Sequence, residues 1–355
     1  MFPLAPVRPF GLRAVVLAAG EGKRLNPLTK NRPKTLLPVA GKPLILRVIQ
    51  ALQRVGVDEV CVVVGPRGGQ LMETLRSVRT PTLRQAVQEK PLGTAHALLA
   101  ARDFIQDEDR FILVYGDLFF QDEMLAGLVR HVGEDFNGGV LAVVQEEARR
   151  FGVLLEENGL LKGIIEKPEN HVGPALINSG IYVLPSGIAE AAESIGPSAR
   201  GEYELTEAIN LLIKQGERIA VYKHRRGYWL DVGTPSSYLE ANLLALTETE
   251  KLGAPHTSTR DSYVCGDVKL GDGVEVKTSV LLEKVKVEEG ATLESTVLLE
   301  NAVVEREAKL SYTIVAESGA VGRGCSLRGI MASPIVVSPG SRVPPYFRAE
   351  PGAVF

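Results

Sequence analysis

Apolar runs and amphipathic stretches alternate along the first two thirds of the chain. Short apolar runs at residues 14–18, 60–64 and 111–115 predict buried strands. Amphipathic stretches at residues 44–55 and 94–101 predict helices between these strands. This alternation indicates an α/β fold, in which a Rossmann-like, mostly parallel sheet carries helices on both faces.

The pattern changes twice further along the chain. Between residues 138 and 184 the strand-like segments follow one another closely, which predicts an antiparallel addition to the sheet. Residues 247–260 are polar, contain a glycine and a proline, and are typical of a linker. We therefore expect an α/β domain over residues 1–246, a linker over residues 247–260 and a second domain over residues 261–355.

In the second domain, apolar residues recur every six positions, with an occasional five-residue step. These residues are Val264, Leu270, Val276, Leu282, Val287, Leu293, Leu299, Val304, Leu310, Val321 and Leu327. Residues six apart do not share a face of a helix, whereas hexapeptide repeats stack them on successive coils of a left-handed parallel β-helix. A valine-rich β-sandwich is the alternative. Residues 334–355 break the period and are expected to cap the β-helix.

Composition narrows the classes of function. The 355 residues include 40 basic and 43 acidic ones, and this net charge of −3 argues against a dedicated nucleic-acid binder. No apolar stretch approaches the ~20 residues that span a bilayer, and residues 1–11 lack the pattern of a secretion signal. Cys61, Cys265 and Cys325 are widely spaced, so neither a disulfide framework nor a zinc cluster is indicated. We expect a cytoplasmic protein without a membrane or nucleic-acid partner.

A glycine loop follows the first predicted strand, with the sequence LAAGEGKRLNPLT at residues 17–29. Gly20 and Gly22 let the backbone approach a phosphate and present its N–H groups. The loop is not a Walker A motif, because Leu17 and Arg24 replace residues that this motif requires. Nor is it a dinucleotide fingerprint, because Leu25 stands where the third glycine belongs. A simple tight turn is the alternative.

Positive charge is concentrated around this loop. Between Gly20 and Lys42 the basic residues are Lys23, Arg24, Lys30, Arg32, Lys34 and Lys42, and the single acidic residue is Glu21. A local charge of +5 in a chain of net charge −3 indicates a subsite for a polyphosphate such as a nucleoside triphosphate. A solvated basic face is the alternative, but it would not need the glycines and prolines of this segment.

These residues resemble the signature of the sugar-1-phosphate nucleotidylyltransferases, or nucleoside diphosphate-sugar pyrophosphorylases. The signature is an L-A-A-G-x-G-x-R-L loop followed by P-K-x-L-x-P, which is similar to residues 33–38. Further matches are Gln88 to Gly93-Thr94, Tyr115-Gly-Asp117, Phe151-Gly152, Glu166-Lys167-Pro168, Asn178-Ser-Gly180, Arg200-Gly-Glu-Tyr-Glu204 and Trp229-Leu-Asp231-Val-Gly-Thr234. The resemblance covers residues 13–245, and several branches of the family also carry a hexapeptide tail. Residues 115–120 and 200–210 look like archaeal-type thymidylyl- or uridylyltransferases of glucose-1-phosphate.

The resemblance implies that a sugar-1-phosphate oxygen attacks the α-phosphorus of an NTP and expels pyrophosphate. Because two anions must meet, positioning and charge neutralisation should dominate catalysis. The resemblance assigns Arg24, Lys34 and Asp117 to catalysis, with Arg24 and Lys34 on the triphosphate. The nucleotide-binding residues that it implies are Leu17, Ala18, Ala19, Gly20, Gly22, Gln88, Gly93 and Thr94.

Several of these residues have a more specific expected role. Gln88 matches the position that reads a pyrimidine, because an amide both donates and accepts hydrogen bonds. Thr94 is expected to cap the helix after Gly93, and no chemistry is assigned to His96. By resemblance, Asp117 and Asp231 together hold Mg²⁺, whose preferred ligands are hard oxygens.

For the sugar phosphate, the resemblance implies a phosphate contact from Lys167 and a hydroxyl acceptor in Glu166. The whole implied set is Gly152, Glu166, Lys167, Asn178, Arg200 and Trp229. One departure concerns the base: Thr35 stands where short thymidylyltransferases have glutamine. We favour dTTP or UTP with glucose-1-phosphate, while a mannose-1-phosphate guanylyltransferase using GTP stays open.

Two other functions compete. A bifunctional enzyme would also transfer acetyl groups to an amino sugar, but such acyltransferases typically need a histidine base in or near the β-helix. All five histidines precede residue 261, which argues against an acetyltransferase activity of the second domain. A catalytically silent regulatory homologue would tend to lose the arginine, lysine and aspartates that this chain keeps. We expect the β-helix to assemble a homo-oligomer, so that truncation after Thr259 would spare nucleotidyl transfer.

Overall fold

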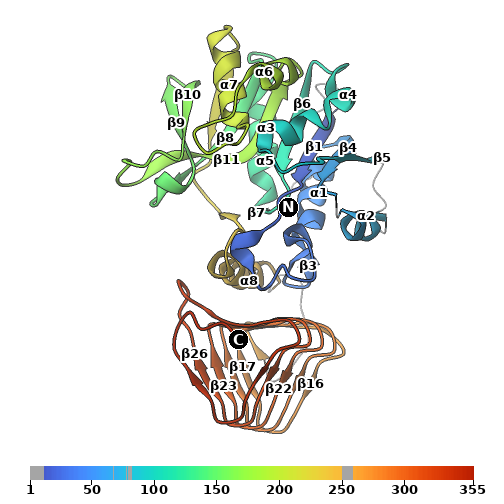
Figure 1. Ribbon diagram of the computed structural model, residues 1–355, viewed down its shortest axis with the longest axis vertical. Helices are drawn as coiled ribbons and strands as arrows, with labels where there is room; N and C mark the ends of the chain where they lie inside the picture. Colours follow the sequence, from blue (N-terminus) through green and yellow to red (C-terminus); the bar gives the residue numbers. More distant parts are fainter. Residues whose placement is uncertain (1–11, 67, 77, 79–81, 250–258) are drawn as a thin grey trace. The chain divides into compact units, whose positions relative to one another are not determined.

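A computed structural model describes residues 12–66, 68–76, 78, 82–249 and 259–355, which divide into two compact units (Figure 1). The first unit consists of two segments, one that ends at Glu21 and one over Ile45–Trp229. The second unit consists of Gly22–Leu44 and Leu230–Phe355, so the basic segment belongs with the C-terminal part of the chain. The predicted linker falls mainly outside the described residues, and the predicted domain boundaries stay a prediction.

The first unit is built on a nine-stranded sheet in the order β5-β4-β1-β6-β11-β8-β12-β10-β9. Its strands are β1 (Leu12–Ala18), β4 (Val57–Val64), β5 (Thr82–Val87), β6 (Arg110–Tyr115), β8 (Gly138–Gln145), β9 (Gly152–Glu157), β10 (Leu160–Glu166), β11 (Ala175–Pro185) and β12 (Ile219–Lys223). The first four strands are parallel, whereas β11 pairs antiparallel with both β6 and β8, and β9 with β10. The predicted strands and the antiparallel addition are confirmed.

Helices cover both faces of this sheet. They are α1 (Leu44–Arg54), α2 (Gly69–Arg76), α3 (Thr94–Leu99), α4 (Arg102–Ile105), α5 (Asp122–Val132), α6 (Ile188–Ser194) and α7 (Leu205–Lys214). Alternate strand residues such as Val15 and Leu113 are buried in one core with α3, α6 and α7. On the other face, α5 packs Val132 against Gly139 of β8. The helix predicted at residues 94–101 is confirmed as α3, which ends at Leu99, and a second short helix, α4, follows it.

Short elements complete both units. In the first unit they are β7 (Leu118–Phe120) and a 3₁₀ turn at Ala148–Arg150. The basic segment of the second unit forms 3₁₀ turns at Lys23–Leu25 and Lys34–Leu36 and a small hairpin of β2 (Pro38–Val39) and β3 (Lys42–Pro43). After β13 (Trp229–Asp231) comes α8 (Pro235–Thr249).

The C-terminal part is a left-handed parallel β-helix of three ladders (Figure 1). The first ladder consists of β14 (Thr259–Arg260), β17 (Glu275–Lys277), β20 (Thr292–Glu294), β23 (Lys309–Ser311), β26 (Ser326–Arg328) and β29 (Arg348–Ala349). The second consists of β15 (Tyr263–Val264), β18 (Val280–Leu281), β21 (Val297–Leu298), β24 (Thr313–Val315) and β27 (Ile335–Val337). The third consists of β16 (Lys269–Leu270), β19 (Lys286–Val287), β22 (Val303–Val304), β25 (Ala320–Val321) and β28 (Arg342–Val343). All ladder pairs are parallel, with Val276 opposite Leu293 and Leu293 opposite Leu310. One coil therefore takes 17 residues, which explains the occasional five-residue step.

Two details of the repeat differ from the prediction. Leu282 and Leu299 are buried, but the paired ladder runs through the preceding residues, Leu281 and Leu298. The expectation that residues 334–355 leave the repeat is wrong for most of this stretch, because β27, β28 and β29 form another coil. This coil is preceded by extra residues that form a small loop, closed by a bridge between Ile330 and Ser333. The last residues continue the parallel stacking, with Val354 in a parallel bridge to Val336.

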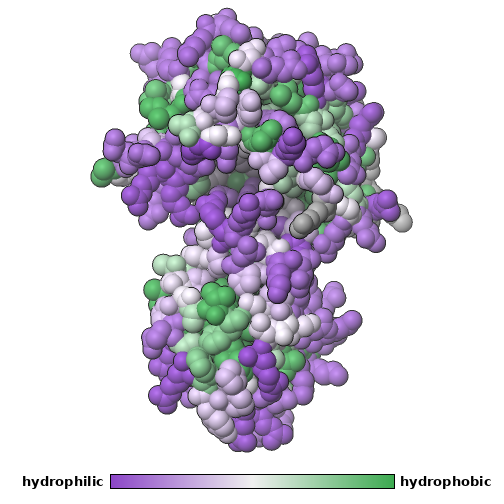
Figure 2. All heavy atoms as spheres, viewed as in Figure 1, coloured by the Kyte–Doolittle hydropathy of each residue, from purple (hydrophilic) through white to green (hydrophobic). Residues whose placement is uncertain are grey.

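Exposed apolar side chains lie on the last coil and in the segments before and after it. Ile330, Phe347 and Val354 are exposed by 51%, 40% and 59%. Figure 2 shows hydrophobic residues gathered on the surface of the β-helix in this view. Repeat proteins cover such ends by capping or association, and the homo-oligomer stays a prediction. Within the described residues, no helix is long and apolar enough to cross a membrane.

Candidate active site

Three of the predicted site segments lie at one edge of the parallel sheet. Ala18 at the end of β1 is opposite Val64 of β4, which is opposite Val87 at the end of β5. On the other side, Leu17 is opposite Tyr115 at the end of β6. The segments that continue from these strands contain Ala19 and Gly20 after β1, Gln88 after β5 and Asp117 after β6. Ligands of open α/β sheets gather at this carboxyl edge.

Gln88 is held rigidly at this edge. Its side chain is buried, with the residue 5% exposed, and its backbone N–H donates to the Val64 carbonyl at 2.8 Å. Its Nε2 donates to the Gly93 carbonyl at 3.0 Å and lies 3.1 Å from His96 Nδ1. Both amide hydrogens therefore have a partner when His96 Nδ1 is the acceptor, and Oε1 is the atom left to read a ligand. His96 has a role that the sequence analysis missed, since nothing in the motif pointed to it.

The Gly93-Thr94 pair ties α3 to α7. Gly93 has φ +118°, and a Cβ there would lie 2.5 Å from the Tyr203 carbonyl oxygen, so only glycine fits. Thr94 is the first residue of α3, and its Oγ1 accepts a hydrogen bond of 2.9 Å from the Leu205 N–H. The prediction that Thr94 caps its own helix is wrong: its hydroxyl satisfies the first turn of α7 instead. A capping side chain from another element leaves no local pattern in the sequence.

The predicted sugar-phosphate residues are brought together around Glu166, the last residue of β10. Glu166 is opposite Gly152 in the sheet, and a Cβ at Gly152 would lie 3.0 Å from Glu166 Oε2. Glu166 Oε1 lies 3.6 Å from Lys167 Nζ and 3.5 Å from Arg200 Nη2. Its Oε2 accepts a hydrogen bond of 3.2 Å from the Thr206 hydroxyl, a residue that sequence analysis did not single out.

An open groove of about 1060 Å³ runs past this cluster in the first unit. Lys167 and Arg200 both line it, with side chains 47% and 35% exposed. Arg200 also pairs with Glu204, which is nearly buried and belongs to the matched motif. Glu166, Glu169, Glu204 and Glu207 line the groove as well, so Lys167 and Arg200 supply the cationic donors that an anionic group such as a phosphate would use.

Asn178 and Trp229 are engaged within the fold. Asn178 Oδ1 accepts the Gly180 N–H at 3.1 Å. Trp229 is 7% exposed, donates its Nε1–H to the Ser179 carbonyl at 3.0 Å, and meets Phe151 edge-on at 5.6 Å between ring centroids. The contact between Trp229 and Phe151 fixes the backbone beside Gly152. The sugar contacts of Asn178 and Trp229 stay predictions.

The second unit contains the predicted cations. Gly22 has φ +68°, and a Cβ there would lie 2.8 Å from Lys34 Cβ, so the glycine lets the two 3₁₀ turns touch. Arg24 Nη2 lies 3.6 Å from Asp231 Oδ2. The Arg24 side chain is 62% exposed and that of Asp231 is 25% exposed, so the guanidinium keeps donors available to a ligand.

The predicted magnesium ligands belong to different units, Asp117 to the first and Asp231 to the second. Both offer carboxylate oxygens, the donor type that Mg²⁺ prefers, and this chemistry fits the ion. Among the described residues, no group of three or more His, Cys, Asp or Glu side chains could hold a metal. A two-carboxylate site completed by phosphate oxygens is not such a group, so the shared Mg²⁺ stays a prediction.

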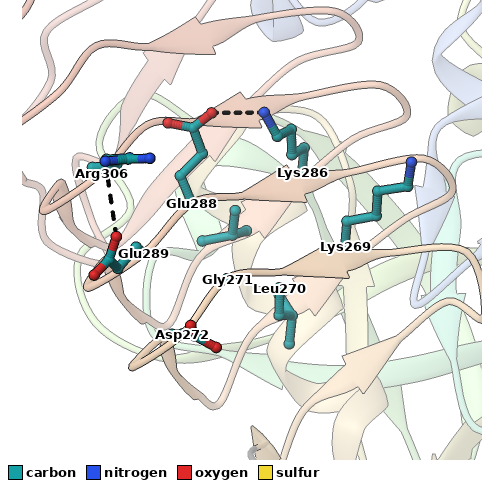
Figure 3. Close-up of a pocket in the computed structure, with 9 residues that line it drawn as sticks. Lys269, Leu270, Gly271, Asp272, Lys286, Glu288, Glu289 and Arg306 are labelled. Carbon is teal, nitrogen blue, oxygen red and sulfur yellow. Dashed lines mark hydrogen bonds and ion pairs between the residues drawn. The ribbon is translucent and has the colours of Figure 1, made fainter.

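A shallow hollow of about 360 Å³ lies on the β-helix (Figure 3). Lys286 Nζ pairs there with Glu288 Oε1 at 2.7 Å, and Arg306 with Glu289 at 3.9 Å. The residues that line it are Lys269, Leu270, Gly271, Asp272, Lys286, Val287, Glu288, Glu289 and Arg306. None of them is a histidine, so this hollow offers no imidazole base for acetyl transfer.

Comparison with known proteins identifies the family. The family described as "Nucleotidyl transferase" matches residues 13–248, and the one described as "GlmU-like, C-terminal hexapeptide" matches residues 248–343. The first match covers more than half of the chain. The chain belongs to the nucleotidyl transferase family, and its β-helix is a hexapeptide domain of the GlmU-like type.

Curated relatives carry several names. The low-salt glycan biosynthesis nucleotidyltransferase Agl11 of Haloferax volcanii is 34% identical over 267 residues, 74% of this chain and 73% of its own length. A glucose-1-phosphate thymidylyltransferase of Streptomyces griseus is 34% identical over 278 residues, covering 76% and 75%. The bifunctional protein GlmU of Methanococcus maripaludis is 36% identical over 231 residues, 64% of this chain and 53% of its own length. This chain thus spans about half the length of that bifunctional relative.

Solved structures share the fold of about two thirds of the chain. A Bacillus anthracis protein described as a glucose-1-phosphate thymidylyltransferase, crystallised with a sucrose, is 30% identical with a TM-score of 0.60. The match covers 66% of this chain and 95% of that one. A UDP-glucose pyrophosphorylase complexed with UDP-glucose has the same TM-score of 0.60 over 67% of this chain and all of that one. Its 24% identity shows the fold alone.

Replacing Gly22 by alanine should destabilise the second unit. The new Cβ would meet Lys34 Cβ at 2.8 Å in a left-handed backbone conformation, which we expect to cost about 1–3 kcal/mol in the free energy of unfolding. Urea denaturation measures the loss. Gly20→Ala is the matched control, because a Cβ at Gly20 meets nothing within 4 Å. Equal stability of the two variants would contradict the assigned contact.

Proposed function

We propose that this chain transfers a nucleotidyl group from an NTP to a sugar-1-phosphate, giving an NDP-sugar and pyrophosphate. One observation carries the proposal: the Gly20 loop, the buried Gln88 and Asp117 meet at the carboxyl edge of a parallel sheet, in a chain of the nucleotidyl transferase family. A glycine loop presents N–H groups to phosphates, the buried amide reads a base, and the aspartate supplies a hard oxygen.

The hydrogen bonds of Gln88 support a base that offers a ring N–H. Its Nε2 is engaged by the Gly93 carbonyl and by His96, so Oε1 is the reading atom. An acceptor at this place suits N3–H of uracil or thymine and N1–H of guanine. Cytosine and adenine have an acceptor at the corresponding ring nitrogen and can donate to Oε1 only through the neighbouring amino group. We favour UTP or dTTP, because the relatives include a glucose-1-phosphate thymidylyltransferase.

The groove around Glu166 supports a sugar-1-phosphate as the second substrate. Lys167 and Arg200 provide cations for the phosphate, while Glu166 accepts from a sugar hydroxyl. The backbone of Lys167 is fixed in a left-handed conformation, with φ +44°, and its N–H donates to the Phe151 carbonyl at 3.0 Å. This hydrogen bond holds Lys167 beside Gly152, another residue of the predicted sugar-phosphate set. Glucose-1-phosphate is the favoured sugar, on the same relatives.

Catalysis rests on positioning and charge. Arg24 forks two phosphate oxygens of the NTP, and Lys34 neutralises the charge that moves to the leaving pyrophosphate. Attack by the sugar phosphate on the α-phosphorus forms one P–O bond as the bond to pyrophosphate breaks, and no covalent enzyme intermediate is needed. Bound by Asp117 and Asp231, a Mg²⁺ ion would supply further neutralisation at the transferring phosphate.

A matrix of NTPs against sugar-1-phosphates, read by pyrophosphate release, tests the proposal. We expect turnover with UTP or dTTP and glucose-1-phosphate, and none with CTP or ATP. Preference for GTP with mannose-1-phosphate would select the guanylyltransferase alternative. Absence of turnover with every pair, in a folded protein with Mg²⁺, would indicate a silent homologue. The bifunctional alternative is tested by acetyl-CoA consumption with glucosamine-1-phosphate, which we expect to be zero.

Activity should require Mg²⁺, and Asp231→Asn should remove most of it by losing a charged ligand. We expect kcat at saturating Mg²⁺ to fall by about 10²-fold or more with the fold intact by circular dichroism. Asp272→Asn makes the same chemical change on the β-helix and should keep wild-type turnover. Full turnover in excess EDTA would rule out the metal assignment.

Lys34→Ala should lower kcat more than it raises the KM for NTP. The lysine charge matters most when negative charge shifts to the leaving pyrophosphate, so its loss should cost about 10²-fold in kcat. Steady-state kinetics at saturating sugar phosphate separate the two constants. A raised KM with unchanged kcat would restrict Lys34 to ground-state binding.

A further inference from the structure

The basic segment Gly22–Leu44 is bound to the β-helix by a fork of hydrogen bonds from Arg32. Arg32 Nη1 donates to Glu300 Oε1 at 3.2 Å, and Nη2 to Glu300 Oε2 at 2.9 Å. Nη2 also lies 3.9 Å from Glu317 Oε2. The side chains are only 17%, 30% and 16% exposed, so this guanidinium is largely withdrawn from solvent and from any ligand. A bidentate, partly buried pair fixes both position and orientation.

The acids belong to one column of the β-helix. Ser318 N–H donates to the Glu300 carbonyl at 2.9 Å, and Asn301 N–H to the Glu283 carbonyl at 3.0 Å, so Glu283, Glu300 and Glu317 occupy the same corner of successive coils. Glu317 additionally accepts from Asn31 Nδ2 at 3.1 Å. Glu283 lies at the same corner but is exposed. The two acids that face the segment are thus distinguished from a chemically identical one that does not.

Further hydrogen bonds join the segment to α8. The Tyr238 hydroxyl of α8 donates to the Pro38 carbonyl at 2.7 Å, and Asn242 Oδ1 accepts the Ala40 N–H at 3.0 Å. Tyr238 and Asn242 are fully buried. At the start of α8, Ser236 Oγ donates to the Met331 carbonyl at 2.8 Å, in the loop that precedes the last coil. The segment, α8 and the β-helix therefore form one connected polar network.

The position of Arg32 gives this network a consequence for chemistry. Arg32 precedes Pro33 and Lys34, and a 3₁₀ turn begins at Lys34, with the Leu36 N–H donating to the Pro33 carbonyl at 2.9 Å. Proline fixes one backbone angle between the two basic residues, so anchoring the Arg32 side chain restricts where Lys34 lies. Gly22 packs on Lys34 Cβ and begins the turn that contains Arg24.

We propose that Glu300 and Glu317 of the β-helix, through Arg32, position Lys34 and Arg24 for nucleotidyl transfer. Arg32 is then a positioning residue, and the hexapeptide domain contributes to catalysis as a scaffold without touching substrate. This inference rests on the proposed function. It reverses the expectation that truncation after Thr259 would spare nucleotidyl transfer.

The test compares Glu300→Gln with Glu283→Gln in the full-length protein. Glutamine keeps the shape but removes the charge that the guanidinium fork needs. We expect Glu300→Gln to lower kcat by about tenfold with less than about threefold change in the KM for NTP, because small misplacement of catalytic cations costs rate. Glu283→Gln should stay within about twofold of wild type in both constants. The substrates are the pair with the highest turnover in the matrix.

Two further variants separate positioning from general stability. Arg32→Gln combined with Glu300→Gln should be no slower than either single variant, because both break the same pair. The charge swap, which combines Arg32→Glu with Glu300→Arg, should have a higher kcat than Arg32→Glu alone, because it restores a pair of opposite charges. A lowered melting temperature with unchanged kcat in Glu300→Gln would reduce the pair to a structural contact and overturn the proposal, as would equal kcat values for Glu300→Gln and Glu283→Gln.

Hydrogen exchange provides a readout that needs no turnover. Amides of residues 34–37 should exchange at least about tenfold faster in Glu300→Gln than in wild type or Glu283→Gln, since anchoring limits local opening. If wild type turns over no substrate pair, the proposed function fails while this measurement still decides whether the β-helix holds the segment. Unchanged exchange in Glu300→Gln would overturn the positioning role even in an active enzyme.

Discussion

The concentration of positive charge in Gly22–Leu44 is the constraint on which the rest of the structure depends. Like charges a few ångströms apart repel, and the repulsion is relieved only by counter-charges or by a ligand. The structure divides the segment's arginines accordingly. Arg32 is withdrawn from solvent and neutralised by Glu300, whereas Arg24 is 62% exposed and lies 3.6 Å from Asp231. One guanidinium therefore anchors the segment, and the other keeps donors available for phosphate.

Much of the fold could be predicted because its signals are local. Buried parallel strands are continuous apolar runs, and a β-helix repeats apolar residues at fixed steps. The errors arose where local signals are ambiguous. Leu281 and Leu282 are both apolar and both buried at a corner of the coil, so the sequence does not reveal which one is paired. Prolines masked the last coil, because they stand outside its short strands at residues 335–337, 342–343 and 348–349.

In the candidate site, the sequence identified single functional residues but not the side chains that hold them. Motifs identified Gln88 and Glu166, but their partners are distant side chains. His96 lies outside the motif, eight positions from Gln88, and Thr206 is 40 positions from Glu166. The Arg32–Glu300 pair spans 268 positions. Pairs of this kind arise from tertiary packing and leave no period or spacing in a single sequence. They can be identified only in the three-dimensional structure.

The acidic column and the basic segment constrain each other. Successive coils of a β-helix are about 4.8 Å apart, so two glutamates at the same corner repel when partly buried. Glu300 and Glu317 are tolerated at this corner because Arg32 and Asn31 face them, whereas Glu283 remains in solvent. Removing one partner of such a pair leaves an uncompensated buried charge, which costs more than the pair contributes. The arrangement therefore specifies one placement of the segment on the coils, and this specificity is what a site built on exposed cations requires.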